Sequence, residues 1–190
     1  MKRHPSLEAF SRDHNVGLIF GRRLVQASSL DEGGRQAAVG ELLQYWSDEL
    51  ADHFMEEERL LLSLIPSAEL RHRLVEDHRE FSAIVDYLVD RRGDPDLMGR
   101  AGELLAIHIR WEERVLFPEI QRTATTRQLE ELSDQTRLVE DRRSNSPWSP
   151  RRGELVRRRK AGHLSDSSRD RAERLAIERW ETEGGRLVAV

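Results

Sequence analysis

The sequence predicts an all-α protein, in which an antiparallel up-down four-helix bundle is followed by a C-terminal helical extension. Apolar residues recur every three or four positions along four long stretches, and this spacing is typical of helices with one buried face. Short turns join the second, third and fourth stretches. Because a short connection returns the chain beside the helix that it has just left, consecutive helices should run antiparallel.

The first two predicted helices are separated by the loop SSLDEGG. The first helix begins at about Ser6 or Ser11 and ends at Ala27. The second runs from about Arg35 to Ile65, where Pro66 ends it because the residue before a proline disfavours the helical conformation. The apolar stripe of the first helix consists of Leu7, Phe10, His14, Leu18, Gly21 and Val25, and that of the second consists of Val39, Leu42, Trp46, Leu50, His53, Glu57, Leu61 and Leu64.

The third and fourth predicted helices begin with recognisable caps. Ser67 is the expected N-cap of the third helix. After the turn RRGDPD, Asp94 should cap the fourth helix and Pro95 suits its first position. The fourth helix should bend or stop near Pro118. The stripe of the third helix consists of Leu70, Leu74, His78, Phe81, Val85 and Leu88, and that of the fourth consists of Leu97, Ala101, Leu104, His108, Glu112 and Val115.

Composition limits the chemistry that the chain can carry out. At 190 residues, with 37% hydrophobic and 35% charged side chains, it can form one domain of ordinary size plus a tail. Cysteine is absent, which excludes disulfides, thiolate nucleophiles and cysteine-ligated metal sites. The N-terminus has no apolar run typical of a signal peptide, and no stretch approaches the roughly 18 apolar residues of a membrane span. We therefore expect a cytoplasmic protein without a membrane partner.

Charge divides the chain into regions of different character. Residues 1–122 carry 16 basic and 23 acidic side chains, whereas residues 123–190 carry 15 and 12. This change predicts a helical bundle over 1–122, an additional helix over 123–143 and a linker with a basic, partly helical tail over 144–190. The additional helix has a thin apolar face of Leu129, Leu132 and Val139. An acidic main domain is a poor general binder of nucleic acid, so a nucleic-acid partner is not expected.

Ionisable residues interrupt the apolar stripe of every predicted helix of the bundle. Counted from the turns between helices, the His and Glu positions of the second, third and fourth stripes fall within roughly one helical turn of the same level. The longer first loop leaves the level of His14 less closely fixed. Six residues should therefore meet in one layer of the core: His14, His53, Glu57, His78, His108 and Glu112.

A bound metal ion would explain these six residues, because burying carboxylates without compensation is costly. Imidazole and carboxylate suit iron, zinc or manganese, and carboxylates can bridge two ions. The HxxxE spacing alone is weak evidence, since His4 and His72 also precede a glutamate by four residues and such pairs are usual on solvated helix surfaces. Its repetition in HFMEEERLLL and HIRWEERVLFP is the stronger signal. A metal-free polar core is the alternative.

The order His, HxxxE, His, HxxxE, with the phrases SRDHN, HFMEEE, EDHREF and HIRWEERVLFP, resembles the hemerythrin-like, or HHE cation-binding, domain. The resemblance covers about residues 1–122 and implies a four-helix bundle with a non-heme di-iron centre. It implies metal ligands at all six positions, with Glu57 and Glu112 as bridging carboxylates. Zinc or manganese are alternatives to iron.

The chain departs from the oxygen carriers of that family at Leu74, where those proteins have an additional histidine. Water or another carboxylate, such as Glu56, would have to fill that place, which argues against reversible dioxygen storage. Asn15 stands where many bacterial relatives have a second histidine, and we expect at most a supporting hydrogen bond from it.

Three functions of different classes follow from these observations. The first is a di-iron protein that binds or senses dioxygen, nitric oxide or iron. The second is a di-iron enzyme that consumes peroxide or protects against oxidative damage, for which the sequence indicates no catalytic acid or nucleophile. The third is a helical interaction protein that uses its basic tail to bind a partner.

Overall fold

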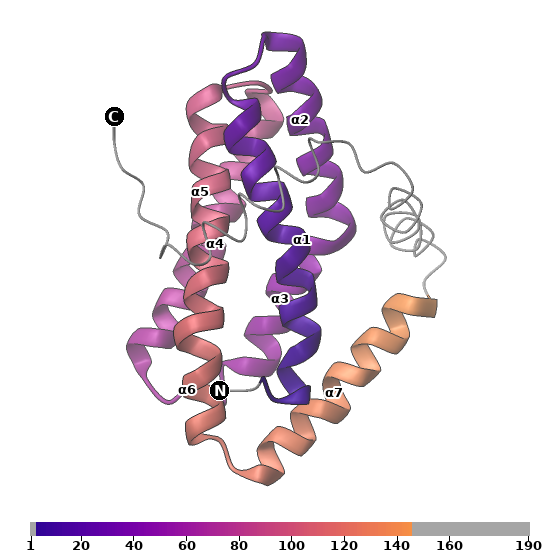
Figure 1. Ribbon diagram of the computed structural model, residues 1–190, viewed down its shortest axis with the longest axis vertical. Coiled ribbons are helices and arrows are strands. Elements are labelled where there is room, and N and C mark those ends of the chain that lie inside the picture. The colour runs from indigo at the N-terminus through magenta and orange to yellow at the C-terminus, as the bar shows by residue number, and fades with distance from the viewer. Residues whose placement is uncertain (1–2, 146–190) are drawn as a thin grey trace, which may run out of the picture. The chain divides into compact units, whose positions relative to one another are not determined.

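The computed structural model describes residues 3–145, and within them every regular element is helical (Figure 1). The all-α prediction is therefore confirmed for this part of the chain. The predicted linker and basic tail lie outside the described residues, apart from positions 144 and 145. The elements are α1 (Pro5–Ala27), α2 (Glu32–Tyr45), η1 (Trp46–Leu50), α3 (Ala51–Leu61), α4 (Ala68–Asp90), α5 (Pro95–Trp111), η2 (Glu112–Leu116), α6 (Phe117–Thr123) and α7 (Thr126–Asn145).

Side-chain caps determine where the first two helices begin. The Nδ1 atom of His4 accepts a hydrogen bond from the backbone N–H of Ser6 at 3.3 Å, so α1 starts at Pro5. Asp31 accepts from the N–H of Gly34 at 2.8 Å, so α2 starts at Glu32. The predicted start of the second helix at Arg35 was wrong because this cap was overlooked.

The caps of α4 and α5 are those that the sequence predicts. The hydroxyl of Ser67 accepts from the N–H groups of Glu69 and Leu70 at 3.2 and 3.3 Å. The carboxylate of Asp94 accepts from two N–H groups at 3.0 and 3.1 Å, and Pro95 follows it. Gly93 has a φ of 90°, a left-handed conformation that favours glycine and lets the turn close before α5.

Two π-helical turns, η1 and η2, lie inside otherwise α-helical segments. The elements α2, η1 and α3 follow one another without a break, and so do α5, η2 and α6. The second helical segment ends at Leu61, four residues before the predicted end. Pro118 does not stop the last segment, because it lies in the first turn of α6, where its missing N–H costs little. Of the two predicted alternatives, a bend or a stop near Pro118, the stop was therefore wrong.

The core consists of two hydrophobic clusters, and His14, Glu57 and His78 lie between them along α1, α3 and α4. The first cluster contains Leu24, Leu50, Phe54, Phe81 and Leu105 among others. The second contains Leu7, Phe10, Leu61, Leu74, Phe117 and the α7 residues Leu129, Leu132 and Val139. Along α1 the chain passes from the second cluster to the first, and along α3 from the first to the second. The order reverses again in α4 and once more from α5 to α6.

Glycines bring α1 and α5 close together, and these two helices lie side by side (Figure 1). A Cβ atom on Gly102 would overlap the carbonyl oxygen of Gly21, and one on Gly21 would lie 2.9 Å from the carbonyl oxygen of Gly102. Such a close backbone approach requires the absence of side chains. It places the middle of α1 directly beside α5, where the candidate site is built.

Two predicted stripe residues are exposed. Val25 is 39% exposed at the edge of the contact between α1 and α5, and Leu24 is buried instead. Val115 is 42% exposed because it lies within η2, and Leu116 takes its place in the core. Among the described helices, none is both long and apolar enough to cross a membrane.

Candidate metal centre

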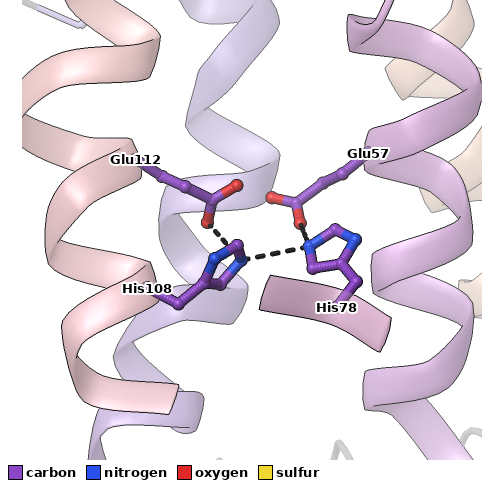
Figure 2. Close-up of side chains that lie close together, drawn as sticks. All are labelled: Glu57, His78, His108 and Glu112. Carbon is purple, nitrogen blue, oxygen red and sulfur yellow. Dashed lines mark hydrogen bonds and ion pairs between the residues drawn. The ribbon is translucent and has the colours of Figure 1, made fainter. Parts of the chain in front are cut away.

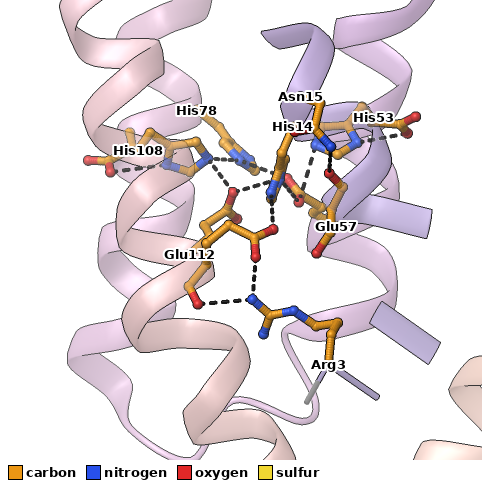
Figure 3. A network of polar contacts seen from close by, with 12 residues as sticks. Arg3, His14, Asn15, His53, Glu57, His78, His108 and Glu112 are labelled. Carbon is orange, nitrogen blue, oxygen red and sulfur yellow. Dashed lines mark hydrogen bonds and ion pairs between the residues drawn. The ribbon is translucent and has the colours of Figure 1, made fainter. Parts of the chain in front are cut away.

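All six predicted ligands lie together and are buried. His14 comes from α1, His53 and Glu57 from α3, His78 from α4, His108 from α5, and Glu112 from the first position of η2. The two glutamates have no exposed surface, and the four histidines are 2–4% exposed. Figures 2 and 3 show their side chains pointing toward one another from different helices.

One group of possible metal donors contains Glu57, His78, His108 and Glu112, whose ligand atoms all lie within 4.8 Å of one another (Figure 2). The Nε2 atoms of His78 and His108 are 3.0 Å apart. The Nε2 of His78 is 3.4 Å from Oε2 of Glu57, and the Nε2 of His108 is 3.3 Å from Oε2 of Glu112. Two imidazoles and two carboxylates thus face one point.

A second group contains His14, His53 and Glu57, and it shares Glu57 with the first. Oε1 of Glu57 is 3.2 Å from the Nε2 atoms of both His14 and His53. Glu112 also reaches this group, since its Oε2 is 3.1 Å from Nε2 of His14. Each carboxylate therefore contacts histidines of both groups, as a carboxylate between two cations would.

Local helical geometry explains how these side chains reach one place. Residues four apart lie on one face of a helix, which brings His108 and Glu112 together and likewise pairs His53 with Glu57. The N–H of Phe117 bonds to the carbonyl of Glu112 across the π-helical turn. Five residues complete such a turn, so Phe117 lies on the same side of the helix as Glu112. Its ring stacks on His14 with centroids 5.4 Å apart.

Burial and mutual contact shift the pKa values of these groups. Burial by itself would lower the pKa of His53 and of His78, but the charge of Glu57 and hydrogen bonds to carboxylates outweigh it and raise each pKa to about 9. Burial is likewise outweighed at His14, whose pKa is raised well above its ordinary value, mainly by Glu112. Burial would raise the pKa of Glu57, yet the three imidazoles hold it well below its ordinary value.

The buried oxygens of the two glutamates are poorly satisfied within the described part of the chain. Oε2 of Glu57 and both carboxylate oxygens of Glu112 accept no hydrogen bond of good geometry, although imidazole nitrogens lie 3.1–3.4 Å from two of them. Leaving a buried acceptor unsatisfied costs about 1–3 kcal/mol. The donor set, its burial and these unsatisfied oxygens fit bound metal ions.

Several residues considered with the site lie away from its donor groups. Leu74 is completely buried in the second hydrophobic cluster. Glu56 belongs to neither donor group among the described residues. Asn15 is exposed and donates a hydrogen bond to the carbonyl of Ser11 at 3.0 Å, not to a histidine. His72 is exposed, as its place off the apolar stripe predicts.

Sequence reasoning overlooked Asp13, Asp77 and Arg3. Asp13 and Asp77 each contact a histidine of the site and directly precede another one in the sequence, which was the available signal. Arg3, labelled in Figure 3, forms an ion pair with Glu113 and donates to its carbonyl oxygen at 2.9 Å. It also lies over the ring of Phe117. Arg114, the next residue after Glu113, is exposed.

No protein-family model, no curated protein and no solved structure matches this chain. The resemblance to the hemerythrin-like domain thus stays a prediction from the motifs, and function has to be argued from the site.

Proposed function

We propose that this chain is a hemerythrin-like protein that binds a non-heme di-iron centre and uses it to bind or sense a small ligand such as dioxygen or nitric oxide. The observation that carries the proposal is that Glu57 and Glu112 are both buried and each contacts histidines of both donor groups. Such carboxylates suit a pair of cations better than a single one.

An antiparallel four-helix bundle with a C-terminal extension is part of this proposal. It is supported by the order in which the helices pass the two hydrophobic clusters, which reverses from each helical segment to the next. It is also supported by the short connections before α4 and α5. In such a bundle the ligands project inward from four helices, as the six residues do here.

The residues of this chain would divide the donors evenly between two ions. His14 and His53 would hold one ion, His78 and His108 would hold the other, and both carboxylates would serve each of them. When bound, the iron pair supplies reversible one-electron chemistry and open positions for a small ligand. The protein would neutralise the ions with two carboxylates, fix the imidazoles and limit the access of water through their burial.

Apolar side chains also pack against the donors. The ring of Phe54 stacks on His78 with centroids 3.9 Å apart, and Phe117 stacks on His14. Leu74, one helical turn before His78, is a hydrocarbon side chain with no exposed surface. An apolar shell of this kind restricts solvent and charged molecules and admits small neutral ligands.

Anaerobic loading with ferrous iron, followed by metal analysis and optical spectra before and after air, tests the proposal. We expect roughly two iron ions per chain and a ferric spectrum after air. The His108→Ala, Glu112→Ala variant should retain far less iron. A matched control is His72→Ala, Glu76→Ala, which removes a pair of the same HxxxE spacing outside the donor groups, with His72 exposed and Glu76 partly exposed. Equal iron retention by both variants would contradict the proposal.

The same loaded protein separates binding from turnover. A reversible spectral change with dioxygen or nitric oxide, without consumption of peroxide, supports a binding or sensing protein. Sustained peroxide consumption that depends on Glu112 would instead make the protein a di-iron enzyme. A metal-free protein with normal folding and no iron affinity would favour an interaction protein.

A further inference from the structure

The two ring nitrogens of each of the four buried histidines have different neighbours. Its Nε2 atom points into the donor groups, and its Nδ1 atom lies 2.8–3.3 Å from a carboxylate outside them. Three of these outer contacts are hydrogen bonds, and the fourth, between His53 and Asp13, is a close ion-pair contact at 3.3 Å. The four pairs are His14 with Glu113, His53 with Asp13, His78 with Glu58, and His108 with Asp77.

These carboxylates form a closed pattern around the site. Each is the sequence neighbour of one ligand, yet contacts the histidine of a different helix. Asp13 of α1 contacts α3, Glu58 of α3 contacts α4, Asp77 of α4 contacts α5, and Glu113 of η2 contacts α1. The four contacts thus link the four helices in a ring. We call Asp13, Glu58, Asp77 and Glu113 the carboxylate ring.

A carboxylate at Nδ1 determines whether the other ring nitrogen, Nε2, has a lone pair available for a metal ion. It accepts a hydrogen bond from Nδ1–H, which leaves the lone pair of Nε2 directed inward for a metal ion. The same contact fixes the rotation of the imidazole plane. Stacking alone would allow the ring to flip and place Nδ1 inside.

Cationic side chains hold two members of the carboxylate ring in place. Arg3 forms an ion pair with Glu113 and lies 4.9 Å from the centroid of Phe117. Arg73 lies 3.6 Å from Asp77 and 4.4 Å from the centroid of Trp111. Each arginine is thereby fixed both by a carboxylate and by an aromatic ring. This repeated arrangement argues against chance contacts of solvated acids.

We propose that the carboxylate ring consists of positioning residues, each of which orients and fixes the tautomer of the histidine on the neighbouring helix. Its role in metal binding rests on the proposed function, whereas its hydrogen bonds to the imidazoles do not. A substitution in the ring should therefore disturb a histidine distant in sequence and leave the adjacent ligand in place.

Asp77 gives the sharpest test, because it directly precedes one histidine and contacts another 31 residues away. In metal-free protein with ¹⁵N-labelled histidine, we expect slowly exchanging, downfield Nδ1–H resonances for His78 and His108. Asp77→Ala should remove the resonance of His108 and keep that of His78, whereas Glu58→Ala should do the reverse. Asp77→Asn keeps an acceptor without its charge, so the His108 resonance should persist but move upfield. Glu76→Gln, next to Asp77 but bonded to Arg79, should change neither.

Metal affinity provides the second readout. Zinc titration of the full-length protein should show about 10–100-fold weaker binding for Asp77→Ala, with partial recovery in Asp77→Asn. Loss of the His78 resonance in Asp77→Ala, or unchanged zinc affinity in both alanine variants, would overturn the role of the ring. If wild-type protein binds no metal while the resonances respond as expected, the proposed function fails and the positioning contacts stand.

Discussion

The imidazoles of the candidate metal centre must lose protons before they bind a cation, and the structure allows this loss to be counted. Because the pKa values of His53 and His78 are raised to about 9, most of each carries a second ring proton at pH 7. His14, whose pKa is also raised well above its ordinary value, adds a third proton. Filling the site should release about three protons per chain at pH 7.

This release can be measured by calorimetric titration with zinc at pH 7 in buffers of different ionisation enthalpy. The slope of the observed enthalpy against buffer enthalpy should be about three. The overall binding constant should rise about 1000-fold from pH 6 to pH 7, tenfold for each proton. The His72→Ala variant should give the same slope, since this histidine is exposed. A slope of one or less, or a binding constant unchanged over this pH range, would refute the reasoning.

Further predictions concern stability. Gly102→Ala should destabilise the protein by about 1–3 kcal/mol in chemical denaturation, because its Cβ would overlap the backbone of α1. Gly99→Ala in the same helix is the control: no atom lies within 4 Å of its Cβ, so it should stabilise by about 0.5–1 kcal/mol. Metal-free protein should be less stable at pH 9.5 than at pH 6, since His53 and His78 stabilise the fold below their unfolded pKa and lose this contribution as pH rises through about 9. The low pKa of Glu57 gives stability that is present above its ordinary pKa and lost as pH falls below it, so thermal melts at pH 3 should also show a decrease.

The parts of the fold that could be predicted from sequence depend on local chemistry. Ser67 and Asp94 are caps because their short side chains bond to nearby N–H groups, whatever the rest of the chain does. The six buried ligands could be identified because helical periodicity fixes which residues share a face. The level of His14 could not be fixed from the loop length, yet its side chain meets both glutamates.

The two π-helical turns could not be predicted from the sequence. The segments WSDEL and EERVL have the same spacing of apolar residues as the α-helices around them. A π-helical turn is decided by contacts with other helices, such as the stacking of Phe117 on His14. For this reason Val115 was placed in the core.

Asp13 and Asp77, two members of the carboxylate ring, were overlooked for a related reason. Neighbouring residues on a helix point about 100° apart, so Asp13 and His14 cannot both face the centre of the site. The contact between Asp13 and His53 can be predicted only when the rotation of α3 about its own axis is known. Contacts between helices, and not the pattern of any one helix, determine this part of the site.

The π-helical turn η2 also affects where the chain could lose a single residue during evolution. Glu112 and Phe117 are joined by a backbone bond that spans five residues, and four residues would close the same turn in an α-helix. Loss of one exposed residue such as Val115 would leave both side chains on one face. Loss of a residue between His108 and Glu112 would instead turn the carboxylate about 100° away from the site. A deletion of a single codon should therefore be tolerated within η2 and eliminated between His108 and Glu112, one turn earlier.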